Sequence, residues 1–182
     1  GSVLMSESFS EYSSLMTIKN ITENPMKMRE FLKYDHDRYL RGRSGERIKE
    51  LPLYKVENQG YIHYGKGSVI LYALQDYIGE DKVNLAMKNF LEEYRYKKPP
   101  YPTSLDFLKH LEPQVPDSLQ YLVNDWFKEI TLYDNRLKEA NYKTLDNGKY
   151  EVTLEIESAK IKSDSLGNET RVAINDWIDV GF

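Results

Sequence analysis

The sequence contains no cysteine, which excludes both a disulfide framework and a metal site built on thiolates. It has no apolar run close to the ~20 residues that cross a bilayer, and no basic and then apolar signal at its start. Its lysines and arginines form no basic face, because charges of both signs are interspersed and the net charge is −4. We therefore expect a soluble segment that makes no membrane contact of its own and binds no nucleic acid.

Proline and glycine are also few, at 7 and 10 of 182 residues, and no low-complexity tract is present. Hydrophobic residues make up 40% of the chain and aromatic residues 13%. This composition is typical of a globular protein, and the length suits one domain, or one domain with a small appendage.

Apolar residues in the first part of the chain recur at helical spacing. Met5, Phe9, Tyr12 and Met16 follow one another at steps of four, three and four, which predicts a helix over 3–19. Further helices are expected over 26–41, 62–78, 83–94 and 104–111, and from 117 or 118 to about 128.

Individual residues suggest where these helices begin and end. Asn24 followed by Pro25 is a good helix start, since proline suits the first helical position. Gly42 and Gly45 are expected to break the helix that follows, and Asp81 to cap the helix over 83–94. Residues 46–60 are expected to form an extended loop.

The period of the pattern changes from about 3.6 to 2 near residue 132. Four apolar residues at 150, 152, 154 and 156 alternate with polar ones, as in a half-buried strand. Asn147-Gly148 predicts a hairpin turn, and a second turn near 166–168 leads to a third strand. We therefore predict a mainly helical α+β protein, with a helical region over 1–130 and a small antiparallel β-meander over 131–182.

Residues 6–12 read Ser-Glu-Ser-Phe-Ser-Glu-Tyr and form the first of two motifs that bear on chemistry. Glu7 and Glu11 are four apart and share a helix face opposite the apolar stripe. Taken alone, this pattern favours a solvated acidic face. The functional alternative is a metal ligand, because a carboxylate can complete a zinc site of two histidines and one glutamate.

The second motif is residues 61–68, Tyr-Ile-His-Tyr-Gly-Lys-Gly-Ser. Its structural interpretation is a set of core tyrosines at a glycine-rich helix entrance. Its functional interpretation makes Tyr64 a hydroxyl donor to a developing oxyanion, a contribution of roughly 3–4 kcal/mol in known enzymes. Glycines beside it would let substrate or backbone approach closely.

Together and in this order, the two motifs resemble the M1 family of zinc aminopeptidases. Residues 6–12 resemble that family's Asn-Glu-Gly-Phe-Ala-x-Tyr, and residues 64–67 its Tyr-x-Lys-Gly. Residues 100–108 and 125–127 are similar to the helical region that follows in these enzymes. The resemblance covers about 1–130, and the β-region resembles an extension in bacterial proteins that fuse such a domain to an ABC-transporter-type permease.

The resemblance implies a role for each matching residue. Glu7 would be the third zinc ligand, and Tyr64 would stabilise the tetrahedral intermediate. Glu11 is the competing candidate for the position of Glu7, since it shares the same helix face. Ser8 stands where the family has glycine, which affects only the local packing.

One departure from the family decides what this segment can do alone. No His-Glu-x-x-His occurs, and none of His36, His63 and His110 has a histidine partner four residues on. Two zinc ligands and the general base are therefore absent. His36 and His110 are interpreted as surface residues, whereas His63 either lines a pocket or is structural.

We therefore expect a fragment of a zinc metallopeptidase that hydrolyses N-terminal peptide bonds of peptide substrates. The fragment alone is expected to be inactive and not to hold zinc stably, because it needs the upstream half of the catalytic domain. In the complete enzyme, zinc would activate a water, an upstream glutamate would take its proton, and Tyr64 would share the oxyanion charge. The alternative is a non-catalytic module of the same fold that mediates interactions of a membrane transporter.

Overall fold

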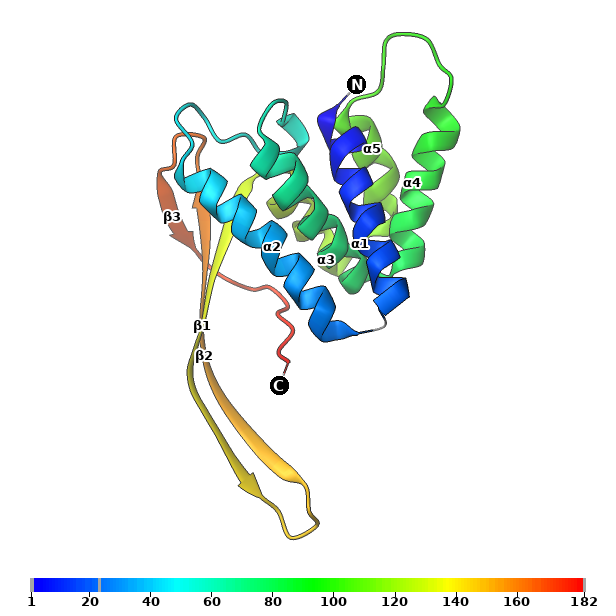
Figure 1. Cartoon of the computed structure of the whole chain (residues 1–182). Coiled ribbons are helices and arrows are strands. Elements are labelled where there is room, and N and C mark those ends of the chain that lie inside the picture. The colour runs from blue at the N-terminus through cyan, green and yellow to red at the C-terminus, as the bar shows by residue number, and fades with distance from the viewer. Residues whose placement is uncertain (1, 23, 182) are drawn as a thin grey trace. The chain divides into compact units, whose positions relative to one another are not determined.

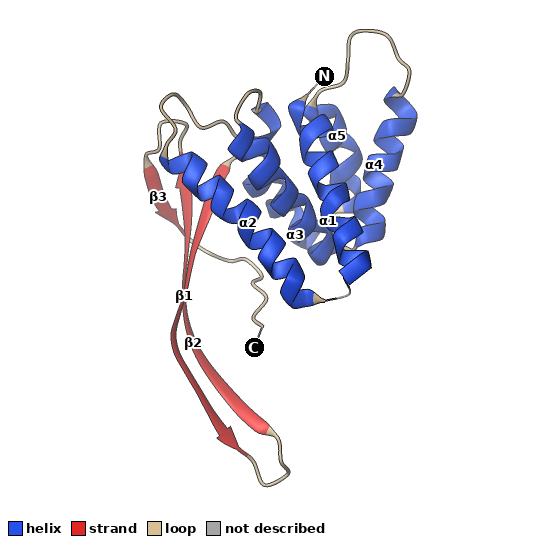
Figure 2. Cartoon of the chain, in the orientation of Figure 1, coloured by secondary structure: helices blue, strands red, loops and turns tan. Residues whose placement is uncertain are grey.

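The computed structural model describes residues 2–22 and 24–181. The chain divides into two compact units, residues 1–130 and 131–182, which are described separately below. The labelled helices lie in the first unit, and the strands occupy the second (Figures 1 and 2). The predicted fold class is confirmed, since the protein is mainly helical with a small three-stranded antiparallel sheet.

The first unit is built from α-helices and short turns of other helical types. The α-helices are α1 (Phe9–Thr22), α2 (Pro25–Ser44), α3 (Gly67–Ile78), α4 (Glu80–Tyr94), α5 (Ser104–Leu111) and α6 (Gln120–Val123). Three π-helical turns span Leu4–Ser8, Tyr61–Lys66 and Asn124–Lys128. The first turn runs directly into α1 and the second into α3, so the helices predicted over 3–19 and 62–78 each begin with a wider turn.

Helix α3 lies in the middle of the helical unit, where it contacts α1, α2 and α4 (Figure 1). Leu71 and Leu74 of α3 are fully buried, as expected for the most apolar helix. Tyr12, Val83 and Phe107 bring α1, α4 and α5 into the same hydrophobic core. This shared core fixes the positions of the turns that precede α1 and α3.

Two predictions about helix ends are wrong. Helix α2 continues through Gly42, because Gly42 serves close packing: a Cβ there would lie 2.3 Å from Cβ of Tyr61. The helix ends at Ser44, and Gly45 caps it, as predicted. Asp81 does not cap α4, which begins at Glu80 directly after Gly79. Gly79 has φ of +95°, a conformation that glycine adopts at little cost, so it allows a sharp connection from α3 to α4.

The second unit is a sheet of three strands in the order β1-β2-β3. The strands are β1 (Ile130–Thr144), β2 (Tyr150–Ser163) and β3 (Glu169–Val172), and β2 pairs with β3 from Lys160↔Val172 to Ser163↔Glu169. The predicted turn at Asn147-Gly148 is confirmed, with φ of +75° at Gly148. The third strand begins after the predicted second turn and ends at Val172.

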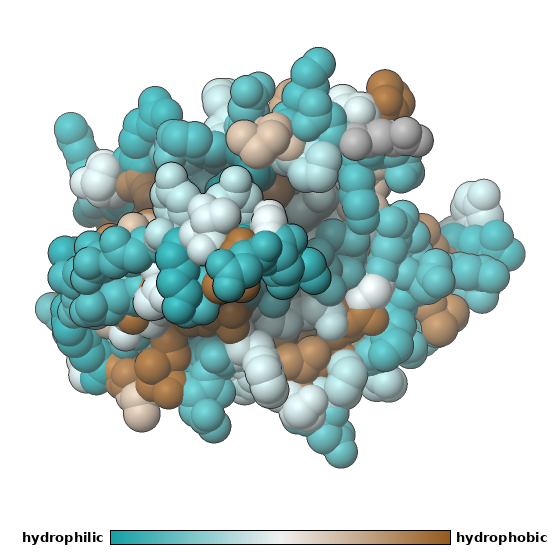
Figure 3. Space-filling model, turned by 90° about the horizontal axis from the view of Figure 1, so that it is seen from below, coloured by the Kyte–Doolittle hydropathy of each residue, from teal (hydrophilic) through white to brown (hydrophobic). Residues whose placement is uncertain are grey.

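The surface carries scattered apolar side chains among polar ones. Ile21, Tyr34 and Ile48 are more than 60% exposed, at 76%, 66% and 84%. Figure 3 shows one face, on which hydrophobic residues interrupt a mainly hydrophilic surface. Over residues 2–22 and 24–181, no helix combines the length and the apolar character needed to cross a membrane.

Candidate functional site

The turns Leu4–Ser8 and Tyr61–Lys66, which carry the two sequence motifs, are in contact. The hydroxyl of Ser8 donates to the main-chain carbonyl of His63 at 2.6 Å. Gly67 makes the approach possible, because a Cβ there would lie 2.1 Å from Oγ of Ser8. Turns of the π type occur frequently at functional sites, where the wider backbone re-aims side chains.

This contact brings the two predicted site residues together. Tyr64 and Glu7 are both half-buried. Hydrogen bonding to Glu7, burial and the charges of Glu7 and Glu11 raise the pKa of the Tyr64 hydroxyl. The hydroxyl therefore keeps its proton at neutral pH and can act as a hydrogen-bond donor.

Helix α2 adds a cation to the site. The guanidinium carbon of Arg38 lies 4.8 Å from the centroid of the Tyr64 ring, a cation–π contact. The positive charge of Arg38 lowers the pKa of the Tyr64 hydroxyl, against the two glutamates. The two glutamates and Arg38 thus act in opposite directions on the pKa of the Tyr64 hydroxyl.

Asp35 is a buried acid on the same helix. Burial raises the pKa of its carboxyl, and the nearby charge of Glu11 adds to this, whereas a hydrogen bond from Ser68 at 3.3 Å and the charge of Arg38 oppose it. The main chain at Asp35 lies close to the second motif, since a Cβ at Gly65 would be 2.9 Å from the Asp35 carbonyl oxygen. The glycine at position 65 therefore lets α2 pack against the turn that carries Tyr64.

His63 lies beside Tyr64, with 4.4 Å between the ring centroids, and is only 7% exposed. Burial lowers the pKa of its imidazole, and the charge of Arg38 adds to this while Glu7 opposes it. The ring is therefore neutral at pH 7. Nδ1 of His63 has no hydrogen-bond partner among the described residues. His63 is therefore a buried neighbour of Tyr64, and both of its interpretations, lining a pocket and a structural role, stay predictions.

The remaining histidines lie elsewhere. His36 is exposed on α2, as predicted for a surface residue. His110 is not: its side chain is only 20% exposed and its Nε2 lies 3.0 Å from a carboxylate oxygen of Glu93 on α4. His110 therefore helps to join α5 to α4 and plays no part around Glu7.

The resemblance assigns Glu7 to a metal site. Its carboxylate stands on a turn anchored by the buried residues Leu4 and Ser8. Within residues 2–22 and 24–181, no group of three or more histidine, cysteine, aspartate or glutamate side chains could hold a metal ion. Glu11, the competing candidate, has an electrostatic influence on both Asp35 and Tyr64.

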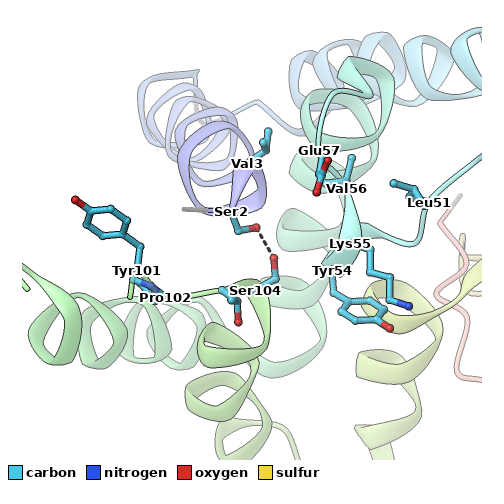
Figure 4. Close-up of a pocket in the computed structure, with 11 residues that line it drawn as sticks. Ser2, Val3, Leu51, Tyr54, Lys55, Val56, Glu57, Tyr101, Pro102 and Ser104 are labelled. Carbon is cyan, nitrogen blue, oxygen red and sulfur yellow. Dashed lines mark hydrogen bonds between the residues drawn. The ribbon is translucent and has the colours of Figure 1, made fainter. Parts of the chain in front are cut away.

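A separate pocket of about 560 Å³ lies between the start of the chain, residues 51–57 and residues 101–104 (Figure 4). The hydroxyls of Ser2 and Ser104 point toward each other there and form a hydrogen bond. Neither Glu7 nor Tyr64 lines this pocket. It is therefore distinct from the site described above.

Arg38 and Asp35 were not singled out by the sequence. They belong to a helix with many charged residues, in which no spacing distinguishes them from a solvated face. Their part in the site depends on how α2 packs against Tyr61–Lys66, and the residue pattern of α2 alone does not predict that packing.

No family model, curated protein or solved structure matches this chain.

Proposed function

We propose that this chain forms one part of a zinc-dependent aminopeptidase of the M1 type, in which Glu7 is a metal ligand and Tyr64 stabilises an oxyanion. The observation that carries the proposal is the contact between the turns Leu4–Ser8 and Tyr61–Lys66, where Ser8 donates to the His63 carbonyl and Glu7 acts on the Tyr64 hydroxyl. The two residues that the resemblance selects for one active site are thus neighbours in space.

Zinc, when bound, lowers the pKa of a coordinated water toward neutrality and supplies a hydroxide for attack on a peptide carbonyl. Glu7 offers one carboxylate ligand from a firmly packed turn. The sequence has no His-Glu-x-x-His, so the remaining ligands and the general base would come from another segment or another chain. By itself, this segment is proposed to be inactive.

The contribution of this chain to the reaction is mainly electrostatic. The Tyr64 hydroxyl is protonated, and in the reaction its single O–H would donate to the carbonyl oxygen under attack instead of to Glu7. A donor held in place before the reaction stabilises the charge that develops on such an oxygen without reorganisation. Arg38, 4.8 Å from the Tyr64 ring, adds a positive charge to the same region.

The test is Tyr64→Phe in a protein that combines this chain with a His-Glu-x-x-His segment. We expect kcat to fall by about 10²–10³, the typical loss for one oxyanion donor, with zinc content unchanged. Tyr101→Phe is the control, since Tyr101 is 60% exposed and lies outside the site. Unchanged turnover in Tyr64→Phe would show that the assigned role is wrong.

The alternative, a non-catalytic interaction module, predicts a different result from the same protein. It would neither bind zinc at Glu7 nor cleave aminoacyl substrates, whatever residue stands at position 64. Zinc content and cleavage of an aminoacyl substrate, measured together before any substitution is made, therefore separate the two functions.

A further inference from the structure

The positive charge of Arg38 lowers the pKa of the Asp35 carboxyl on the same helix. The Arg38 guanidinium lies over the ring of Tyr64, and within the described part of the chain it forms no ion pair with a carboxylate. Its neighbour Arg41, in contrast, lies 3.7 Å from a carboxylate oxygen of Asp37. A guanidinium presents five N–H donors in a planar fork that matches a carboxylate, and most of that capacity is unused at Arg38.

Arg38 also lines a cavity of about 330 Å³, together with Tyr34 and Arg41. These residues are spaced by four and three along α2, so they lie on one face of the helix. The cavity is open to solvent, because Tyr34 is 66% exposed. Two arginines, of which Arg41 is also paired with Asp37, and one phenol hydroxyl make it a site suited to a small anion.

The position of this cavity relates it to the proposed reaction. Arg38 is shared between the cavity and Tyr64, which we assign to the carbonyl that is attacked. One extended residue spans about 3.3–3.6 Å, so a carboxylate held by Arg38 would belong to a residue only two or three positions beyond that carbonyl.

We propose that Arg38, assisted by Arg41, binds a carboxylate of the peptide substrate, so that short peptides with a free C-terminus or peptides with an acidic residue near the N-terminus are the favoured substrates. That the bound carboxylate belongs to a substrate rests on the proposed function, but the carboxylate site itself can be tested by binding alone. Both kinds of peptide present a carboxylate, and the choice of probe distinguishes a C-terminal carboxylate from that of a side chain.

The binding experiment uses the 182-residue chain and three probes: trialanine, trialanine amide and alanyl-aspartyl-alanine amide. Dissociation constants are measured by titration followed by NMR. We expect a carboxylate-bearing probe to bind at least about tenfold more tightly than trialanine amide, as for a charge-assisted arginine pair. Tighter binding of trialanine identifies a C-terminal carboxylate, and tighter binding of the aspartyl peptide identifies a side chain.

Substitutions test whether Arg38 causes the difference in affinity between the carboxylate-bearing probes and trialanine amide. Arg38→Ala is expected to abolish it, and Arg38→Met should do the same while keeping an apolar stem over the Tyr64 ring. Arg29→Ala removes one charge from the opposite face of the same helix and is expected to leave the difference intact. Equal affinity of the three probes for the unaltered chain, or a difference that survives in both Arg38 variants, would overturn the proposal.

An activity measurement in a zinc-loaded protein containing this chain keeps the two proposals apart. There, Arg38→Met should raise KM for the favoured peptide about tenfold more than it raises KM for trialanine amide. If no probe is cleaved at all, the proposed aminopeptidase function fails, and the binding experiment alone decides the carboxylate site.

Discussion

The absence of a side chain at Gly67 lets the two turns of the candidate site pack closely against each other. A Cβ at this position would lie 2.1 Å from Oγ and 2.7 Å from Cβ of Ser8, which is fully buried and bonded to the His63 carbonyl. We predict that Gly67→Ala destabilises the protein by about 1–3 kcal/mol, the usual cost of overpacking.

Urea denaturation of Gly67→Ala measures this loss, and Gly45→Ala is its matched control. A Cβ at Gly45 would meet only main-chain oxygens at 3.8 Å, so we expect a change within about 0.5 kcal/mol. Equal stability of the two variants would mean that Ser8 and Gly67 are not in tight contact.

At the residue scale, the sequence motifs pointed to Glu7 and Tyr64, and the structure brings the turns that carry them into contact. Their contact could not be derived from spacing, because it depends on Ser8 fitting against Gly67. Arg38 could not be found at all, since one arginine on a highly charged helix carries no distinguishing signal.

At the scale of elements, helix α5 begins with a capping box. The Thr103 side chain receives the main-chain N–H at the third helical position, and the Thr103 amide donates to Asp106 at 2.8 Å. We predict that Thr103→Ala costs about 1 kcal/mol of stability, the usual value for a helix cap. Thermal unfolding measures it, with the exposed Thr170→Ala on β3 as the control; equal losses would exclude a capping role.

The same cap predicts a pH dependence. Hydrogen bonds from Lys109 and from the Thr103 amide lower the pKa of Asp106 from 3.8 to about 2. Because the folded-state pKa is depressed, its contribution is fully present above about pH 5 and is lost as the pH falls through 4 toward 2. Asp106→Asn should remove this part of the acid sensitivity.

Unfolding by urea at pH 5 and at pH 2.5 measures the effect. We expect the unaltered protein to lose about 1 kcal/mol more than Asp106→Asn between these two values, the size of a partly exposed cap interaction. Equal losses in the two proteins would show that the Asp106 carboxylate does not stabilise the folded state.

The sequence predicted the types of the secondary-structure elements better than the residues at which they begin and end. Periods of 3.6 and 2 depend on the residues of one segment, so the helices and the hairpin could be predicted. The end of α2 depends instead on Tyr61 packing against Gly42, and the start of α4 on the positive φ of Gly79. The π-helical turns at Leu4–Ser8 and Tyr61–Lys66 left no recognisable signal in the residue pattern.

At the scale of the whole molecule, the sheet unit has its own internal ion pair. Nζ of Lys160 lies 2.9 Å from Asp176, and both side chains are less than a tenth exposed. Tyr133 donates to the same carboxylate at 2.6 Å. Burial alone would raise the pKa of Asp176, but the hydrogen bonds from Tyr133 and Lys160 outweigh it and lower the pKa.

We predict that Asp176→Ala destabilises the sheet unit by about 3–5 kcal/mol, because it removes the carboxylate partner of a buried lysine. Hydrogen exchange of the amides paired between β2 and β3 measures the loss. Asp134→Ala is the control, since Asp134 forms an exposed pair with Arg136 at 2.7 Å that contributes at most about 1 kcal/mol. Similar exchange in both variants would contradict the prediction.

The central claim concerns Glu7, and zinc content tests it most directly. The measurement is the zinc stoichiometry of a protein that joins this chain to a His-Glu-x-x-His segment, compared for Glu7→Gln and Glu11→Gln. Both substitutions remove one carboxylate from the same helix face. We predict one zinc per molecule in the unaltered protein and in Glu11→Gln, and none in Glu7→Gln. Zinc that persists in Glu7→Gln, or is lost only in Glu11→Gln, would contradict the assignment of Glu7.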